Sequence, residues 1–215
     1  ILFRSNRNGV FDLYERRVDG TGTDQLVLHT DYEKWPSDWS HDGRYVIYEE
    51  RTTQDDFWVL PIAGDRKPVA LTRTGFVENH AQFSPDDRWI AYQSNQSGRW
   101  QVYVQPFIAN GTGAPTLGAL YQVSRDGGQR PVWRADGKEL VYVADDNSVM
   151  SVDVTTGSRL QTGAAQLLFQ SPAAMVNFPR LQINSDGRRF LLRPPVSDGG
   201  SGAFTAGLNW QAALR

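Results

Sequence analysis

The chain has 215 residues, of which 40% are hydrophobic and 12% aromatic, enough to build a substantial apolar core. Its 22 basic and 24 acidic side chains give a net charge of -2, which supplies no field to hold a polyanion, so nucleic acid is not an expected partner. No apolar run approaches the roughly 20 residues of a spanning helix, so we expect no membrane contact by this segment. The absence of cysteine excludes disulfides and thiolate metal sites.

The chain opens with a partial repeat unit. It begins inside an apolar run at residues 1–3 without an initiator methionine, which suggests a piece cut from a longer protein, so a signal peptide or membrane segment could sit upstream. The stretch SNRNGVFDLY at 5–14 matches SNQSGRWQVY at 94–103 in length and in its Gly, aromatic and Tyr positions. We therefore predict that residues 1–30 are a partial copy entering at the second strand of the repeat.

Four further copies follow, predicted at 31–75, 76–126, 127–172 and 173–215, the last being a terminal blade. Each has an apolar anchor residue, and the anchors stand 44 to 50 residues apart, a period in the range of four-stranded propeller blades and too long for tetratricopeptide or ankyrin units. The anchors are Trp39, Phe83, Trp133 and Ile183. Because the aromatic anchors recur at one position, we expect them to be core wedges between blades and not sugar-stacking platforms.

Turn chemistry follows each anchor. The motif reads SHDG at 40–43, SPDD at 84–87 and RADG at 134–137, combinations that close tight hairpins. An aspartate occurs at the same turn position in every copy, and we expect it to have a structural role as the cap of the turn. These residues are Asp42, Asp86, Asp136 and Asp186.

Three kinds of strand are predicted after each turn. The runs 45–48 and 89–92 are continuously apolar, which predicts strands buried on both faces. The alternating runs 100–104 and 148–152 predict a half-exposed strand further out, followed by a short edge strand such as 69–72. Residues 164–169 have the best helical period in the chain, but their place in the repeat makes them an edge strand.

The predicted fold is all-β: a β-propeller of four-stranded antiparallel blades, present as a single propeller domain or propeller fragment (1–215) with about four to five blades. Because the chain enters and leaves within blades, we expect upstream blades of a six-bladed ring to be missing. Open blade edges would then allow self-association. The alternative is that residues 1–17 join residues 208–210 in one mixed blade that closes the ring.

The anchor, the Ser-Pro-Asp-Gly-like turn, the basic residue after it and the later aromatic strand resemble the WD-repeat-like propeller repeats of TolB, a periplasmic family of the Tol-Pal system. The same repeats occur in propellers of prolyl oligopeptidase relatives, tricorn-type proteases and the C-terminal regions of bacterial receptor-like Ser/Thr kinases. The ending, INSDGRRFLLRPP followed by AGLNWQAALR, is most similar to the final blade of the kinase group. The resemblance implies a periplasmic or extracytoplasmic module, tethered by an upstream membrane helix in the kinase case.

The sequence shows no constellation for catalysis. The string GGSGA at 199–203 lacks the last glycine of a nucleophile elbow, and the three histidines, His29, His41 and His80, have no close metal-ligand spacing. Glycine directly follows the turn aspartate, unlike in sialidase boxes. The acidic doublets at 55–56, 86–87 and 145–146 could offer oxygens to calcium, although carboxylates in turns are ordinarily solvated. We predict a chain that is not an enzyme and holds no cofactor or metal.

One set of residues suggests a binding site. Three residues before each anchor, at the entrance of the innermost strand, stand Pro36, His80, Arg130 and Arg180. Equivalent positions in a propeller surround the central channel, where two guanidiniums and an imidazole would favour a carboxylate or phosphate. The alternative, which the abundance of paired surface arginines favours, is that Arg130 and Arg180 pair with nearby acids such as Asp126 and Glu78.

The predicted function is a noncatalytic ligand- or protein-binding, sensory module, the extracytoplasmic C-terminal part of a larger bacterial protein such as a receptor-like Ser/Thr kinase or a TolB-like protein. A protein or peptide partner is expected, and a small anionic ligand fits the channel residues. The alternative is the substrate-gating propeller of a prolyl-oligopeptidase-like or tricorn-type peptidase whose catalytic domain is absent. Fold alone does not identify the ligand.

Overall fold

The computed structural model describes residues 1–109, 113–171, 181–184, 187, 189–192 and 206–207. In these residues the regular structure consists of β-strands, with no α-helix. Within the same part of the chain, no helix has the length and apolar character needed to cross a membrane.

The strands form five antiparallel sheets, here called blades 1 to 5 in chain order. Blade 1 contains β1 (Leu2–Asn8), β2 (Val10–Glu15) and β3 (Gln25–Leu28). Blade 2 contains β4 (Glu33–Trp39), β5 (Tyr45–Arg51), β6 (Asp55–Pro61) and β7 (Val69–Ala70). Blade 3 contains β8 (Glu78–Phe83), β9 (Trp89–Ser94), β10 (Gln101–Ile108), β11 (Thr116–Leu117) and β12 (Tyr121–Gln122). Blade 4 contains β13 (Gln129–Trp133), β14 (Glu139–Val143), β15 (Ser148–Thr155), β16 (Gln161–Thr162) and β17 (Gln166–Gln170). Blade 5 contains β18 (Leu181–Ile183), β19 (Phe190–Leu192) and β20 (Ala206–Gly207).

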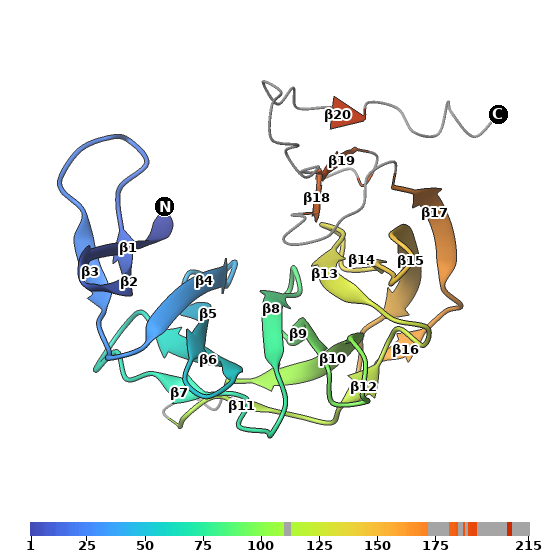
Figure 1. Cartoon of the computed structure of the whole chain (residues 1–215), viewed down its shortest axis with the longest axis horizontal. Helices are drawn as coiled ribbons and strands as arrows, with labels where there is room; N and C mark the ends of the chain where they lie inside the picture. The colour runs from blue at the N-terminus through green and yellow to red at the C-terminus, as the bar shows by residue number, and fades with distance from the viewer. Residues whose placement is uncertain (110–112, 172–180, 185–186, 188, 193–205, 208–215) are drawn as a thin grey trace.

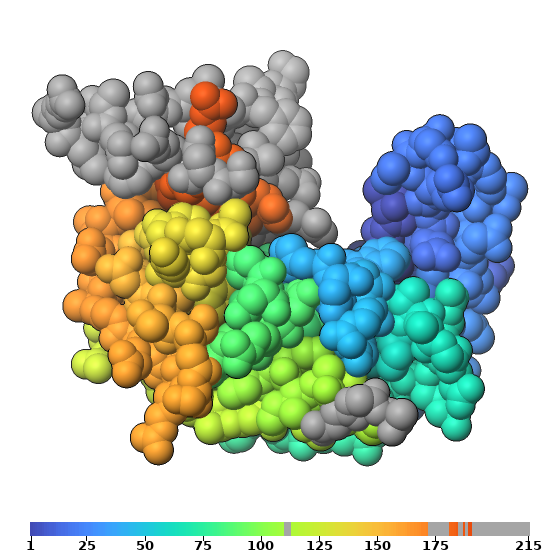
Figure 2. All heavy atoms as spheres, turned by 180° about the vertical axis from the view of Figure 1, so that it is seen from behind, coloured from blue at the N-terminus to red at the C-terminus, as the bar shows by residue number. Residues whose placement is uncertain are grey.

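The blades follow one another around an arc, and the first strands of blades 2 to 5 lie on its inner side (Figure 1). Consecutive inner strands touch: β4 contacts β8, β8 contacts β13, and β13 contacts β18. Seen from behind, blade 1 stands at one end of the arc and blades 4 and 5 at the other (Figure 2). The fold is thus all-β and a partial propeller, as the repeat period predicts.

Blade 1 differs from its neighbours because its sheet has the order β1-β2-β3. The match of residues 5–14 with 94–103 aligns β1 with β9, the second strand of blade 3. In the described chain, blade 1 therefore lacks the innermost strand that β4, β8 and β13 supply in blades 2, 3 and 4.

Apolar clusters fill the interfaces between blades. Phe83 joins Ile47 and Phe57 of blade 2 to Tyr92 of blade 3, and Trp133 joins blade 3 to blade 4. Phe83 is 2% exposed and Trp133 is 7% exposed, while Trp39 is partly buried against the cluster between blades 1 and 2. The aromatic anchors therefore lie at blade interfaces, where their burial contributes about 1.5 to 3 kcal/mol each.

The predicted exposure of the third strand is wrong. In β10, residues 101–104 are all buried, and in β15 only Met150 among residues 148–152 is partly exposed. The fourth strands, β12 and β17, pair with β10 and β15 and cover their outer edges. The far ends of these eight-residue strands pair instead with the short strands β11 and β16, so blades 3 and 4 have five strands where four were predicted. Residues 166–170 form strand β17, as their place in the repeat predicts.

The recurring aspartates accept hydrogen bonds within their own turns. Asp42 Oδ1 accepts from Ser40 Oγ (2.8 Å) and from the Arg44 amide (2.9 Å). Asp86 and Asp136 accept in the same way from the amide two residues later, while Asp186 lies outside the described residues. The contacts suit a turn cap, and the structural role stays a prediction until these residues are substituted.

Candidate functional site

The inner strands of blades 3 and 4 carry β-bulges at the predicted site residues. The register of β8 on β9 shifts between Asn79 and Gln82, and that of β13 on β14 shifts between Gln129 and Val132. Within these bulges His80 has φ +55° and Arg130 has φ +56°. Left-handed backbone at residues with a Cβ is costly, and bulges of this kind re-aim side chains beside functional sites.

Each bulge is held by a side chain from the preceding blade. Glu49 Oε1, on β5, accepts from the His80 amide at 2.7 Å. Gln93 Oε1, on β9, accepts from the Arg130 amide at 2.8 Å. Glu49 and Gln93 occupy the same repeat position, ten residues after their anchors, so one acceptor position fixes both strained residues.

The interface between blades 1 and 2 lacks this hydrogen bond, and both of its repeat positions carry residues that cannot form it. The residue of blade 2 at the bulge position is Pro36, which has no amide hydrogen to donate. The residue of β1 at the acceptor position is Arg4, which cannot accept a hydrogen bond. Both the donor and the acceptor are therefore absent together.

Charge gathers around Glu49. Its Oε1 accepts from Ser37 Oγ at 2.9 Å and lies 4.0 Å from His80 Nδ1. Burial raises the pKa of Glu49, and the opposing effects come from the His80 amide, the Ser37 hydroxyl and the charge of Arg130. The His80 side chain is 32% exposed and that of Glu49 11%, so a ligand in solvent would meet the imidazole first.

The structure therefore brings two of the three sequence-predicted ligand residues, His80 and Arg130, to neighbouring inner strands around one buried carboxylate. Arg180 lies outside the described residues. Glu78, one of the two acids suggested as partners of Arg130 and Arg180, accepts from Thr74 Oγ1 (2.6 Å) and Ser94 Oγ (3.1 Å). Sequence reasoning missed Glu49 and Gln93, although their shared position in the repeat was a usable signal.

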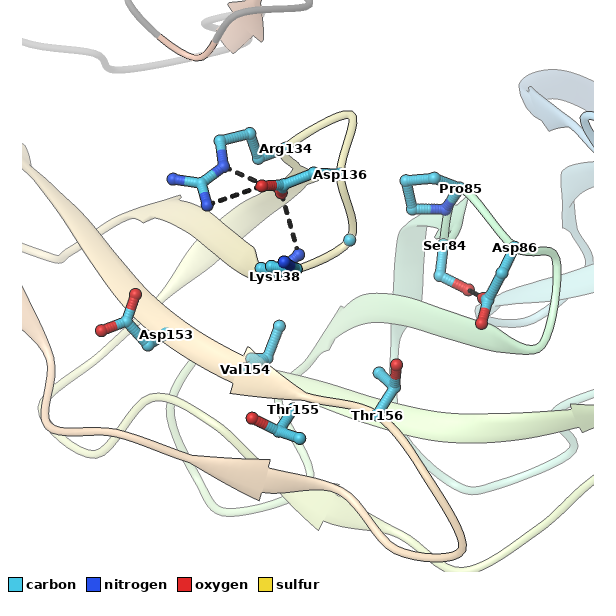
Figure 3. Close-up of a pocket in the computed structure, with 11 residues that line it drawn as sticks. Ser84, Pro85, Asp86, Arg134, Asp136, Lys138, Asp153, Val154, Thr155 and Thr156 are labelled. Carbon is cyan, nitrogen blue, oxygen red and sulfur yellow. Dashed lines mark hydrogen bonds and ion pairs between the residues drawn. The ribbon is translucent and has the colours of Figure 1, made fainter.

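A groove of about 590 Å³ lies elsewhere, between the turn of blade 3, the turn of blade 4 and the end of β15. Figure 3 shows Arg134 and Asp136 next to each other on the turn of blade 4, with Pro85 on the turn of blade 3 opposite them. Arg134 Nη2 lies 2.8 Å from Asp136 Oδ2, and its Nη1 pairs with Glu139. Because this guanidinium is already neutralised by two carboxylates, the groove is a weaker anion site than the inner bulges.

One residue of each acidic doublet is engaged in an ion pair or in hydrogen bonds. Asp55 pairs with Arg51 at 2.9 Å and Asp145 with Arg99 at 3.2 Å, while Asp87 accepts from the amides of His41 and Asp42. The part of the chain that the structure describes holds no group of three or more His, Cys, Asp or Glu side chains placed to bind a metal ion.

Comparison with solved structures gives propellers. The chain matches TolB from Acinetobacter baumannii at 19% identity and a TM-score of 0.64, covering 89% of this chain and 47% of that one. It matches a putative TolB from Agrobacterium tumefaciens at 20% identity and a TM-score of 0.60, covering 77% and 61%. An enzyme also matches, a gluconolactonase from Xanthomonas campestris, at 12% identity and a TM-score of 0.58, covering 89% and 64%.

No protein-family model matches the chain, and no curated protein matches it. The chain spans about half to three fifths of the length of the two TolB structures. At these identities the likeness shows the fold, a TolB-like β-propeller, and function has to be argued from the site.

Proposed function

We propose that this chain is a noncatalytic binding and sensory module that receives a carboxylate-bearing segment of a protein or peptide, or a small anion, at the inner strands of blades 3 and 4. His80 and Arg130 make the contacts with the ligand. Glu49 and Gln93 are positioning residues, because they act by holding the two bulges.

The left-handed bulges carry the proposal. A His and an Arg that adopt φ near +55° on adjacent inner strands keep their backbone in a conformation that costs of order 1–3 kcal/mol each. The surrounding acceptors, at 2.7 and 2.8 Å, are what make that conformation stable. The free-energy cost of the two left-handed residues supports a role for their side chains in recognition. Their chemistry selects carboxylate or phosphate oxygens.

The proposal extends to the setting of the chain. A TolB-like fold that covers about half of a TolB structure fits one part of a larger ring of six blades. We place this module in an extracytoplasmic, periplasmic protein of bacteria, either TolB-like or the C-terminal region of a receptor-like Ser/Thr kinase tethered by an upstream membrane helix. Incomplete rings leave open blade edges, which fits self-association.

In the test, acetylated hexaglutamate is titrated into the isotope-labelled chain as the acidic probe. Hexalysine is the control peptide of opposite charge. We expect hexaglutamate to shift the amide resonances of His80 and Arg130, and Arg130→Gln to weaken its binding about tenfold, the size expected when a charge-assisted hydrogen bond is lost. The matched control is Arg125→Gln, which removes the same charge from an exposed position nearby. Equal weakening by the two variants would reduce the effect to net charge and reject the site.

A further inference from the structure

A buried ammonium group lies between blades 1 and 2. Lys34, near the start of β4, and Asp12, on β2, are both fully buried, and Lys34 Nζ lies 3.0 Å from Asp12 Oδ1. The same ammonium donates to the backbone carbonyl oxygens of Thr30 and Tyr32, at 3.3 and 2.7 Å. A single positive charge thus occupies a position surrounded by oxygen atoms at this interface.

The next interface carries a carboxylate where this lysine stands. Glu78, at the start of β8, and Lys34 each stand five residues before their anchors. Glu78 is 1% exposed, so the repeat places a buried negative charge between blades 2 and 3 at the position that holds a buried positive charge between blades 1 and 2.

The partner position is acidic at both interfaces, because Asp56 of β6 corresponds to Asp12 of β2. Asp12 lies opposite Ser5, and Asp56 lies opposite Glu50. Ser5 aligns with Ser94 in the match of residues 5–14 with 94–103, and Ser94 and Glu50 both stand eleven residues after their anchors. Between blades 2 and 3 the two positions are therefore occupied by two acids, Asp56 and Glu78.

These two carboxyls lie against the same segment, residues 72–74. Burial raises the pKa of both, and the charge of Asp56 raises the pKa of Glu78 further. The hydroxyl of Thr72 opposes burial and lowers the pKa of each carboxyl. Thr74 also acts on both, through its amide on Asp56 and through its hydroxyl, 2.6 Å from Oε1, on Glu78.

Each of the two carboxyls has one oxygen that is left over. Asp56 Oδ1 and Glu78 Oε2 are buried and have no hydrogen-bond partner among the described residues. The other oxygen of Glu78 accepts from the hydroxyls of Thr74 and Ser94. Buried acceptors without a donor are costly, and two like charges near each other add to the cost.

The neighbouring side chains do not supply the missing positive charge. The charge of Arg73 acts on Asp56, but Arg73 is exposed, its guanidinium stacks 5.3 Å from the ring centroid of Trp58, and it forms no ion pair within the described residues. The corresponding positions between blades 3 and 4 carry Gln101 and Gly128, which are neutral and need no counter-ion.

We propose that Asp56 and Glu78 bind a divalent cation, Ca²⁺ in preference to Mg²⁺, between blades 2 and 3, in the place that Lys34 Nζ occupies between blades 1 and 2. Two carboxylates leave the other coordination positions to hydroxyl, carbonyl and water oxygens, an irregular set that Ca²⁺ accepts and that the strict octahedron of Mg²⁺ does not. The site departs from the sequence-based expectation that the chain holds no metal. It goes beyond the proposed function, because the ion would lie within a blade interface and would join two blades.

Calorimetric titration of the EDTA-treated full chain with CaCl₂ tests the binding. We expect one ion to bind with a Kd between about 10⁻⁵ and 10⁻³ M, the range of sites with few charged ligands, and MgCl₂ to bind more weakly. Glu78→Gln should weaken Ca²⁺ binding at least about tenfold, because the site loses one of its two charges. Asp145→Asn is the matched control: it removes a carboxylate of another acidic doublet, 47% exposed, and should leave the Kd unchanged.

Glu78→Lys tests the comparison of the two interfaces, since it copies the arrangement of Asp12 and Lys34. Ca²⁺ at about 100 times its Kd should raise the midpoint of thermal unfolding of the unmodified chain by about 5 °C relative to EDTA and NaCl of equal ionic strength. Glu78→Lys should abolish this rise and, in EDTA, should unfold at a higher temperature than the unmodified chain.

If Glu78→Lys does not fold, the titration of Glu78→Gln decides without it. The absence of Ca²⁺ binding to the unmodified chain at 10 mM, or Ca²⁺ binding that Glu78→Gln leaves unchanged, would overturn the proposal. So would a Glu78→Gln variant that is more stable than the unmodified chain in saturating Ca²⁺ as well as in EDTA, because a proton and not a metal ion would then neutralise the pair.

Discussion

The interface between blades 2 and 3 and the interface between blades 3 and 4 use the same repeat positions with different chemistry. In the first, a buried carboxylate, Glu49, accepts from the bulge amide, and a second carboxylate, Asp38, accepts from the Phe83 amide at 2.8 Å. In the second, the acceptor is the neutral amide of Gln93. Both of these interfaces thus place an acceptor opposite the bulge amide, whereas the charge of that acceptor differs between them and sets the response to pH.

Substituting the apolar anchors should cause the largest loss of stability, and the loss should be the same at the two interfaces. Phe83→Ala and Trp133→Ala each leave a cavity in a cluster shared by two blades, so we expect each to lower the free energy of unfolding by about 3 to 5 kcal/mol. Urea titration measures the loss. A change below about 1 kcal/mol for either variant would mean that its interface does not depend on the anchor.

The interface between blades 1 and 2 differs from the interface between blades 2 and 3 because its buried carboxylate is paired with a buried ammonium group. Lys34 Nζ lies 3.0 Å from Asp12 Oδ1, and both side chains are fully buried. Burial alone would raise the pKa of Asp12, but the hydrogen bonds from His29 and Lys34 outweigh it and lower the pKa. The stability that Asp12 contributes is therefore present above its ordinary pKa and is lost as the pH falls below it.

We expect Lys34→Ala to cost about 3 kcal/mol at pH 7, because it leaves the Asp12 carboxylate buried with its fully buried partner removed. His29→Ala is the control: the His29 ring is 53% exposed, so its loss should cost less than about 1 kcal/mol. Unfolding free energies of both variants are measured at pH 7, and equal losses would contradict the expectation that the buried partner of Asp12 contributes more than the exposed one.

Much of this architecture could be predicted from the sequence, because the repeat period and the turn motifs fix strand order and place the aromatic anchors at interfaces. The burial of β10 and β15 could not be predicted. Their alternating sequence pattern indicated one exposed face, but neighbouring blades that are distant in sequence cover both faces. The bulges at His80 and Arg130 gave no local signal either, because positive φ is uncommon for any residue with a Cβ, even for the moderately enriched histidine, and here tertiary contacts impose it. The repeat did place both residues on the inner strands.

Exchanging the acceptors tests the role of charge. The raised pKa of Glu49, caused by burial, means that its protonated form fits the fold better. Its stabilising contribution is complete below the ordinary value of 4.5 and is lost as the pH rises through the pKa of the folded state. We expect Glu49→Gln to raise the free energy of unfolding by about 1 kcal/mol at pH 7, because the amide keeps the hydrogen bond to His80 and removes a buried charge.

The gain from Glu49→Gln should therefore grow between pH 4.5 and pH 8 relative to the unmodified chain. The reciprocal change, Gln93→Glu, should destabilise the interface between blades 3 and 4 by about 1 to 3 kcal/mol at pH 7 and by less at pH 4.5. Urea titrations across this pH range measure both trends. A gain from Glu49→Gln that stays constant with pH would show that the Glu49 carboxylate is not responsible for it.

The smallest expected effect concerns the turns at the rim of the same two interfaces. Asp87 adopts φ +56° and accepts from the amides of His41 and Asp42, at 2.8 and 2.9 Å. At the corresponding place between blades 3 and 4 stands Gly137, near Pro85, with φ +69°. Asp87→Gly loses the contacts with both amides and with the His41 ring but relieves the backbone, so we expect a net loss of about 0.5 kcal/mol. Asp87→Ala loses the same bonds and keeps the strain, so it should be about 1 kcal/mol less stable than Asp87→Gly. Thermal unfolding of the two variants separates these contributions, and equal stability of the Ala and Gly variants would mean that the turn relaxes and that the hydrogen bonds alone distinguish the two rims.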